Sequence, residues 1–180
     1  MKIFKYMSAV ILAIAFLVSG CGQRYAITHN LEETFPGSST CKIGYILDEL
    51  PGNFPDDKKP SMEDIDKFKG YLKDALLKAE LFDMKDESGN LYDYEVNGRL
   101  IDYKKGSGFL RFMFGAWAGK AKVTVALKIV EKVNNTEIFA GNFTGEVTSE
   151  FESGLEMFKR VAKDFAAALK KEFKRLNKGK

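Results

Sequence analysis

The sequence predicts a two-layer α+β sandwich with the element order β-α-β-β-β-α, in which a four-stranded mixed sheet carries both helices on one face. Apolar and polar residues alternate in four short stretches, which is the period of half-buried strands. Residues 61–82 and 153–176 instead repeat apolar residues every three or four positions, as helices with one buried face do. The last strand is polar at alternate positions: Asn142, Thr144, Glu146 and Thr148. One face of the sheet should therefore meet water, which leaves the other face for both helices.

The first 20 residues are typical of a lipoprotein signal peptide. Lys2 and Lys5 precede the apolar run "AVILAIAFLV", which is too short for a membrane-spanning helix of about 20 residues. The ending "LVSGC" resembles the bacterial lipobox. That resemblance implies cleavage before Cys21 and attachment of diacylglycerol to its sulfur. Ordinary secretion with a free Cys21 thiol is the alternative. In that case Cys21 and Cys41 could form a disulfide with each other.

A lipid on Cys21 predicts where the mature protein resides. Acyl chains hold a protein on a membrane surface without spanning it, at about 0.8 kcal/mol for each buried CH₂ group. Gly22 stands where an aspartate tends to signal retention in the inner membrane. We therefore expect a protein of the cell envelope that binds the membrane through its N-terminal lipid. It should reside on the outer membrane and face the periplasm.

Charge excludes one class of partner. The chain has 28 basic and 25 acidic residues, and removal of the signal peptide leaves 26 basic residues. A nearly neutral chain lacks the concentrated basic face of nucleic-acid-binding proteins, so we expect no nucleic acid partner. About 160 residues are enough for one core of ordinary size.

The elements follow in order after the signal peptide. Residues 21–39 read as the lipidated cysteine and a tether, and residues 40–177 as a single α+β domain. The first strand, 41–49, places Ile43, Tyr45 and Leu47 on one apolar face. A proline-rich connection leads to a helix that begins at Ser61, where Asp64 completes a capping box, and runs to about residue 82. We expect both this helix and the last one to bury their apolar faces, centred on Phe68 and Phe165.

The remaining strands form one sequential unit. Residues 91–103 alternate again, with Gly98 as a candidate bulge. Residues 120–133 and 137–151 read as a hairpin around the turn at 134–136. The last helix has Ser153 and Glu156 as a second capping box. Its lysine-rich end is interpreted as a solvated face that complements the helix dipole.

The segment "GSGFLRFMFGAWAG", residues 106–119, has three interpretations. It lacks the hydroxyl residue that a phosphate-binding loop needs after lysine, since Ala121 follows Lys120. It favours a structural bend between two strands, with glycines at the sharp turns. The minority interpretation is insertion into lipid or contact with a partner or ligand. Four residues would make that contact: Phe109, Arg111, Phe112 and Trp117.

The pattern from residue 106 to 147, "GSGFLRFMFGAWAGKAKVTVALKIVEKVNNTEIFAGNFTGEV", resembles the bacterial lipoprotein family called domain of unknown function 4410 (DUF4410). The resemblance covers roughly residues 41–175. It departs from the family at residues 134–136, where asparagines stand in place of the expected aspartate and glycine. It implies a small α/β module of the envelope and no particular activity.

No catalytic constellation is found. His29 is the single histidine and lies in the predicted tether, and Cys41 reads as a small buried residue of a strand. A hydrolase needs a nucleophile, a base and an orienting group together. We expect no enzyme, no cofactor and no metal site. The prediction is a non-enzymatic binding or assembly module with an envelope protein partner. The alternative is an accessory lipoprotein of a lipid or hydrophobe transport system with an apolar groove near 109–117.

Overall fold

The fold is described from a computed structural model of the chain, which describes residues 24–36, 39–85, 91–106, 120–147 and 155–178. Six strands and two long helices follow one another in these ranges. In chain order they are β1 (Tyr25–His29), β2 (Thr40–Asp48), a 3₁₀ turn η1 (Asp56–Lys58), α2 (Met62–Ala79), β3 (Asp83–Met84), β4 (Tyr94–Lys104), β5 (Ala121–Glu131), β6 (Thr136–Val147) and α4 (Leu155–Lys178).

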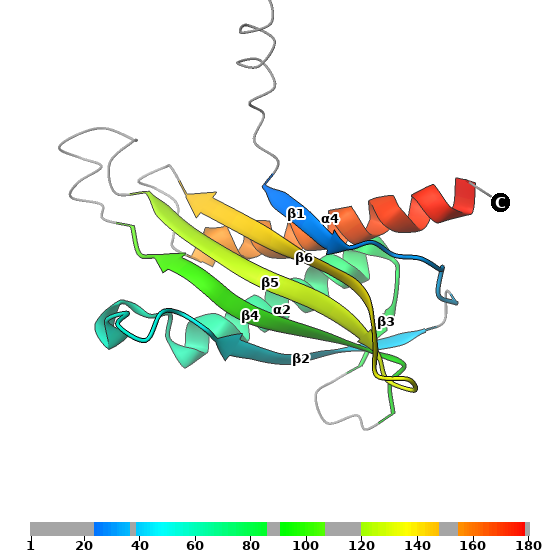
Figure 1. Cartoon of the computed structure of the whole chain (residues 1–180), viewed down its shortest axis with the longest axis horizontal. Helices are drawn as coiled ribbons and strands as arrows, with labels where there is room; N and C mark the ends of the chain where they lie inside the picture. The colour runs from blue at the N-terminus through cyan, green and yellow to red at the C-terminus, as the bar shows by residue number, and fades with distance from the viewer. Residues whose placement is uncertain (1–23, 37–38, 86–90, 107–119, 148–154, 179–180) are drawn as a thin grey trace, which may run out of the picture.

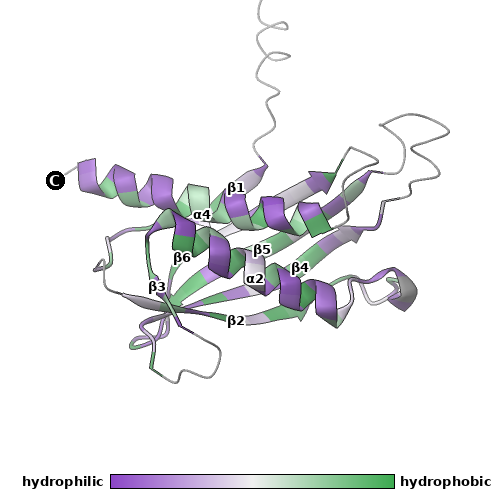
Figure 2. Ribbon diagram, turned by 180° about the vertical axis from the view of Figure 1, so that it is seen from behind, coloured by the Kyte–Doolittle hydropathy of each residue, from purple (hydrophilic) through white to green (hydrophobic). Residues whose placement is uncertain are grey.

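The six strands form one mixed sheet in the order β1-β6-β5-β4-β2-β3. β2 runs parallel to β3 and β4, and the other neighbouring pairs are antiparallel. Both helices lie on the same face of this sheet, as the two opposite views show (Figures 1 and 2). The predicted α+β class and the placement of the helices agree with the structure, and no helix within the described ranges covers the other face.

The sheet has six strands, so the expectation of four was wrong. The two extra strands are at its edges. β1 comes from the predicted tether and pairs with β6, and the two-residue β3 pairs with Thr40 and Cys41. Leu31 and Phe35, which follow β1, are buried, and Phe35 stacks on Phe82 with ring centroids 4.3 Å apart. Residues 25–35 of the predicted tether therefore contribute to the sheet and to the core. Both strands are too short to show a two-residue period.

The core lies between the helices and the sheet. Phe68 of α2 and Phe158 of α4 are fully buried against each other, with ring centroids 5.1 Å apart. Phe165 of α4 reaches the sheet, where it contacts Phe139 and Phe143 of β6. The apolar helix faces predicted from their three- and four-residue spacing are confirmed.

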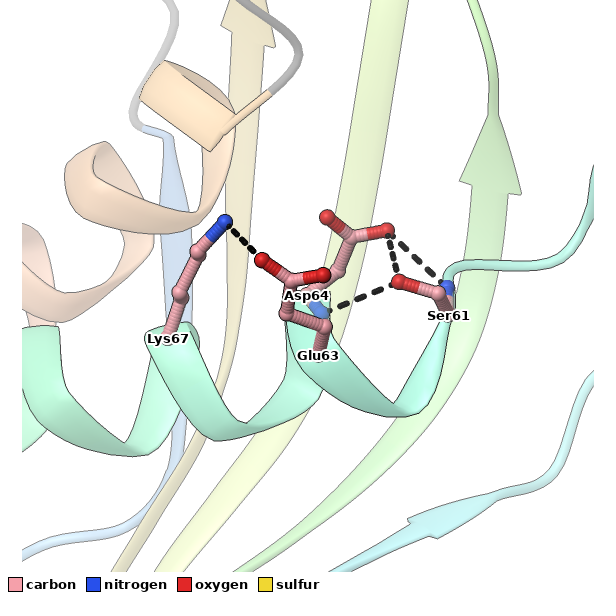
Figure 3. A network of polar contacts seen from close by, with 4 residues as sticks. All are labelled: Ser61, Glu63, Asp64 and Lys67. Atoms are coloured by element: carbon pink, nitrogen blue, oxygen red, sulfur yellow. Dashed lines mark hydrogen bonds and ion pairs between the residues drawn. The ribbon is translucent and has the colours of Figure 1, made fainter.

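Local signals start and end α2. Ser61 Oγ accepts from the Asp64 N–H at 3.1 Å, and Asp64 Oδ2 accepts from the Ser61 N–H at 2.9 Å. Figure 3 shows this capping box beside the ion pair of Lys67 and Glu63. The helix ends at Ala79, because Glu80 adopts the left-handed conformation at φ 57°; the expected end near 82 was too late. The second predicted box falls partly on Ser153, outside the described residues.

The bulge of β4 lies between Leu100 and Asp102, and the candidate position at Gly98 was wrong. Gly98 pairs regularly with Leu127. A Cβ at Gly98 would lie 2.6 Å from Cδ1 of Ile46 and 2.9 Å from Cδ2 of Leu127. This glycine therefore lets neighbouring side chains close over β4 in the core, which is a packing role.

Candidate interaction surface on the open face of the sheet

The bare face of the sheet carries a hollow of about 490 Å³, here called the open-face groove. Five of the six strands contribute to it. Its side chains come from β1 (Thr28), β2 (Tyr45, Leu47), β4 (Asn97, Arg99), β5 (Ala126, Lys128) and β6 (Glu137, Ala140, Asn142). A surface that crosses most of a sheet can contact a partner over a wide area.

One wall of the groove depends on a bulge in β2. The pairing with β4 shifts between Ile43 and Ile46, opposite Asn97. Asn97 is a buried polar residue; its Oδ1 accepts from the Tyr45 N–H at 3.1 Å and its Nδ2 donates to Glu95 Oε2 at 3.3 Å. A Cβ at residue 44 would collide with Oδ1 of Asn97, so Gly44 makes room for this amide.

The bulge reverses the phase of β2 and corrects the sequence prediction. Ile43 and Ile46 face the helices, whereas the expectation put Ile43, Tyr45 and Leu47 together on the apolar side. Tyr45 and Leu47 instead lie on the open face, 49% and 47% exposed. One extra residue in a strand moves every later side chain to the opposite face. The signal that pointed to this was a glycine inside a strand pattern.

Small residues form the floor of the groove. Arg99 pairs with Ala126 of β5, and Ala126 pairs with Asn142 of β6. In the next row Lys128 pairs with Ala140. Because Ala126 and Ala140 are short and have longer neighbours, the face is hollowed where they lie.

The charges around the groove are balanced. Lys128 and Glu137 lie 3.6 Å apart across β5 and β6, and Arg99 Nη1 donates to Glu49 Oε2 at 3.1 Å. Exposed ion pairs of this kind contribute little to stability, typically about 0–1 kcal/mol. The groove therefore presents both positive and negative charges beside an exposed tyrosine and leucine. This composition suits a protein partner better than a polyanion or a metal ion.

Both edges of the sheet adjoin this face. β3 covers β2 only at Thr40 and Cys41, so within the described residues no strand pairs with the outer side of 42–48. β1 is the opposite edge and pairs only with β6 in the described part of the sheet. Unpaired N–H and C=O groups at an edge can pair with another chain. The exposed Tyr45 and Leu47 belong to the open half of β2.

Cys41 and His29 are the two candidate reactive side chains among the described residues. Cys41 is fully buried, and burial raises the pKa of its thiol to about 12, with Glu95 adding to the effect. A thiol with so high a pKa is not a nucleophile at neutral pH. His29 lines a separate hollow of about 320 Å³ among Glu32, Glu33 and Glu131. In the described ranges, no three histidine, cysteine or acidic side chains gather in a way that could hold a metal ion.

The structure does not describe the residues singled out from the sequence. Cys21, Phe109, Arg111, Phe112 and Trp117 all fall outside the described residues, as does the apolar groove expected near 109–117. The open-face groove was not foreseen, because the strand pairing that forms it is not visible in the sequence and Gly44 was not interpreted as the sign of a bulge. Across the described ranges, neither helix is both long and apolar enough to cross a membrane.

Comparison with known proteins finds one family and several similar folds. The model of the domain of unknown function DUF4410 matches residues 52–149, which confirms the resemblance over a shorter range. A single-substitution variant of PelC from Paraburkholderia phytofirmans, solved as a dodecamer, is 8% identical with a TM-score of 0.58, over 81% of this chain and 95% of that one. A second PelC dodecamer gives 11% identity and a TM-score of 0.56, over 81% and 97%.

A third similar structure is the lipoprotein GNA1162 from Neisseria meningitidis. It is 10% identical with a TM-score of 0.42, over 64% of this chain and 85% of that one, which is too loose a likeness to equate the folds. No curated protein sequence matches the chain. At these identities the PelC structures support the fold and leave the activity open.

Proposed function

Since this chain belongs to the DUF4410 family, whose defining domain has no known function, we propose a role from its surface: it is a lipid-anchored envelope lipoprotein that acts as a non-enzymatic assembly module. It resides on the outer membrane through acylated Cys21 and faces the periplasm. Its partner in assembly is a second copy of the same chain, and contact is made through the open face and the free edge of β2.

The observation that carries this proposal is the position of Tyr45 and Leu47. Both are about half exposed, and both lie on the stretch of β2 that no described strand covers on its outer side. Tyrosine is enriched among the residues that carry most of the binding energy of protein interfaces, and Leu47 adds apolar area beside Tyr45. An edge strand gives backbone hydrogen bonds, and the neighbouring apolar side chains give specificity.

Two further features support a copy of the chain as the partner. The sheet has two different free edges, β1 and β2, so a β1 edge on one copy and a β2 edge on the next form a head-to-tail contact. Contacts of that kind close into rings or extend as filaments. PelC, which shares the fold, was solved as a dodecamer.

The test is the oligomeric state of the protein purified from membranes in detergent, measured by light scattering after size-exclusion chromatography. We expect an oligomer, and we expect Tyr45→Lys with Leu47→Lys to shift it to the monomer. Leu91→Lys is the matched control, because Leu91 is 89% exposed and lies outside the groove.

A wild-type monomer at all accessible concentrations would refute self-assembly. Equal effects of the groove variant and the Leu91 control would place the contact elsewhere. Mass spectrometry of the mature N-terminus tests the anchor separately, and an unmodified Cys21 thiol would refute it.

A further inference from the structure

The C-terminal half of α4 gathers cations on its outer side. A shallow hollow of about 530 Å³ is lined there by Ala167, Lys170, Lys171, Lys174, Arg175 and Lys178, here called the basic face of α4. Five of these six residues are positively charged, and none is acidic. Figure 2 shows that this half of the helix is mostly hydrophilic where it is turned away from the sheet.

Arg175 is bonded to other described residues, and the four lysines of this face are not. Arg175 donates from Nε to Glu172 at 2.9 Å and from Nη2 to the Leu31 carbonyl at 3.0 Å. Lys170, Lys171, Lys174 and Lys178 form no ion pair with the described part of the chain. The helix dipole favours cations only in the last turn, so it does not account for Lys170 and Lys171. The sequence suggested a solvated face, but solvation alone does not explain why the lysines gather on one side of the helix.

The basic face lies beside β1, the strand nearest to the predicted anchor. Burial raises the pKa of the Asp164 carboxyl on α4. The positive charge of Arg24, the residue before β1, acts in the opposite direction and offsets part of this rise. Further along, Arg175 bonds Leu31 just after β1 ends. Asp164, Lys171 and Arg175 are seven and four residues apart, which places them on one side of the helix. That side therefore runs along β1 and the chain that follows it.

The described part of the fold begins three residues after the predicted anchor. Arg24 is already part of the fold, since its carbonyl accepts from the Thr144 N–H at 2.7 Å. Only three residue steps separate it from Cys21, a reach of at most about 11 Å at 3.6 Å per residue. Lys171 is seven residues from Asp164, roughly 10 Å along the helix axis. A lipid on Cys21 would therefore hold Lys171, near the start of the basic face, within about two Debye lengths of the bilayer surface.

We propose that the basic face of α4 binds the headgroups of anionic phospholipids in the membrane to which Cys21 anchors the chain, and so fixes the orientation of the domain. This inference rests on the proposed lipid anchor. Charge complementarity selects the partner: several unpaired lysines with no acidic neighbour in the hollow attract a negatively charged surface. With the outer side of α4 towards the bilayer, the open face of the sheet, on the opposite side of the molecule, is turned away from the membrane.

The test compares the acylated full chain in vesicles of phosphatidylcholine alone and in vesicles that also contain phosphatidylglycerol. An amine-reactive reagent labels exposed lysines, and mass spectrometry reads the extent at each one. We expect labelling of Lys170, Lys171, Lys174 and Lys178 to fall about threefold or more with phosphatidylglycerol, and to recover at about 1 M salt, where screening shortens the Debye length to about 3 Å. Labelling of Lys58 and Lys85, which do not line the basic face, should not change.

A charge-reversed variant gives a second measurement. With those four α4 lysines changed to glutamate, Lys163 reports on the surface, because it is exposed and lies four residues before Ala167 on the same side of the helix. Its protection by phosphatidylglycerol should be lost. The matched control changes four exposed lysines elsewhere to glutamate, Lys58, Lys85, Lys104 and Lys105, and should keep that protection at the same net charge.

Each outcome decides the proposal. Equal labelling in the two vesicle types, or loss of Lys163 protection in both variants, would overturn it. Protection that a soluble polyanion also produces with phosphatidylcholine vesicles would point to an acidic polymer and overturn the lipid assignment. An unmodified Cys21, together with protection that still depends on phosphatidylglycerol, would refute the anchor and leave the α4 surface standing.

Discussion

Replacing Phe165 with alanine should remove the contact that joins α4 to the sheet. The side chain is fully buried, and its ring centroid lies 5.8 Å from that of Phe139 and 5.3 Å from that of Phe143. Truncation of a buried phenylalanine costs about 3–5 kcal/mol. The edge-to-face geometry with Phe143, at 88°, adds a favourable aromatic contact of about 0.5–1.5 kcal/mol. We therefore expect a loss in the upper part of the first range, about 4 kcal/mol.

Urea denaturation followed by circular dichroism measures this loss. For an m-value of about 2 kcal/mol/M, a decrease of about 4 kcal/mol lowers the midpoint by roughly 2 M without a change in m. Because domains of this size are stable by only about 5–15 kcal/mol, the variant should be close to its limit. Leu91→Ala, at an exposed position, should change stability by less than about 0.5 kcal/mol. A loss under about 1 kcal/mol for Phe165→Ala would refute the packing of α4 on β6.

Two further predictions concern small residues. A Cβ at Gly145 would collide with the carbonyl oxygen of Met157, a backbone atom that cannot rotate away, so Gly145→Ala should destabilise by about 1–3 kcal/mol. Gly70 has open space around it in α2, so Gly70→Ala should stabilise the protein by about 0.5–1 kcal/mol. If the urea midpoints of the Gly145→Ala and Gly70→Ala variants moved in the same direction, these two predictions would be contradicted. Because burial raises the pKa of Cys41 to about 12, iodoacetamide at pH 8 should leave its thiol unmodified until urea unfolds the chain, and rapid labelling of the native protein would disprove the burial.

The local elements were determined by the sequence alone. The three- and four-residue spacing identified both helices and the face that each one buries. Ser61 and Asp64 marked the start of α2 through bonds that span only three residues. The hairpin of β5 and β6 followed from two alternating stretches around a turn, where Asn135 adopts φ 52°. Interactions of this range depend on neighbours along the chain, so a pattern of residues is enough to predict them.

The edges and the open face were decided by the tertiary structure. β1 is a strand because β6, far along the chain, offers it an edge, and five residues carry too weak a pattern to show this. Tyr45 and Leu47 face outward because Asn97, 52 residues from Tyr45, bonds its backbone and fixes the bulge in β2. The alternation of a strand tells which residues share a face only while the pairing stays regular. Likewise, only the packing of α4 beside β1 brings its lysines close to the predicted anchor. Both surfaces on which function is proposed therefore depend on contacts between distant segments, which no local pattern encodes.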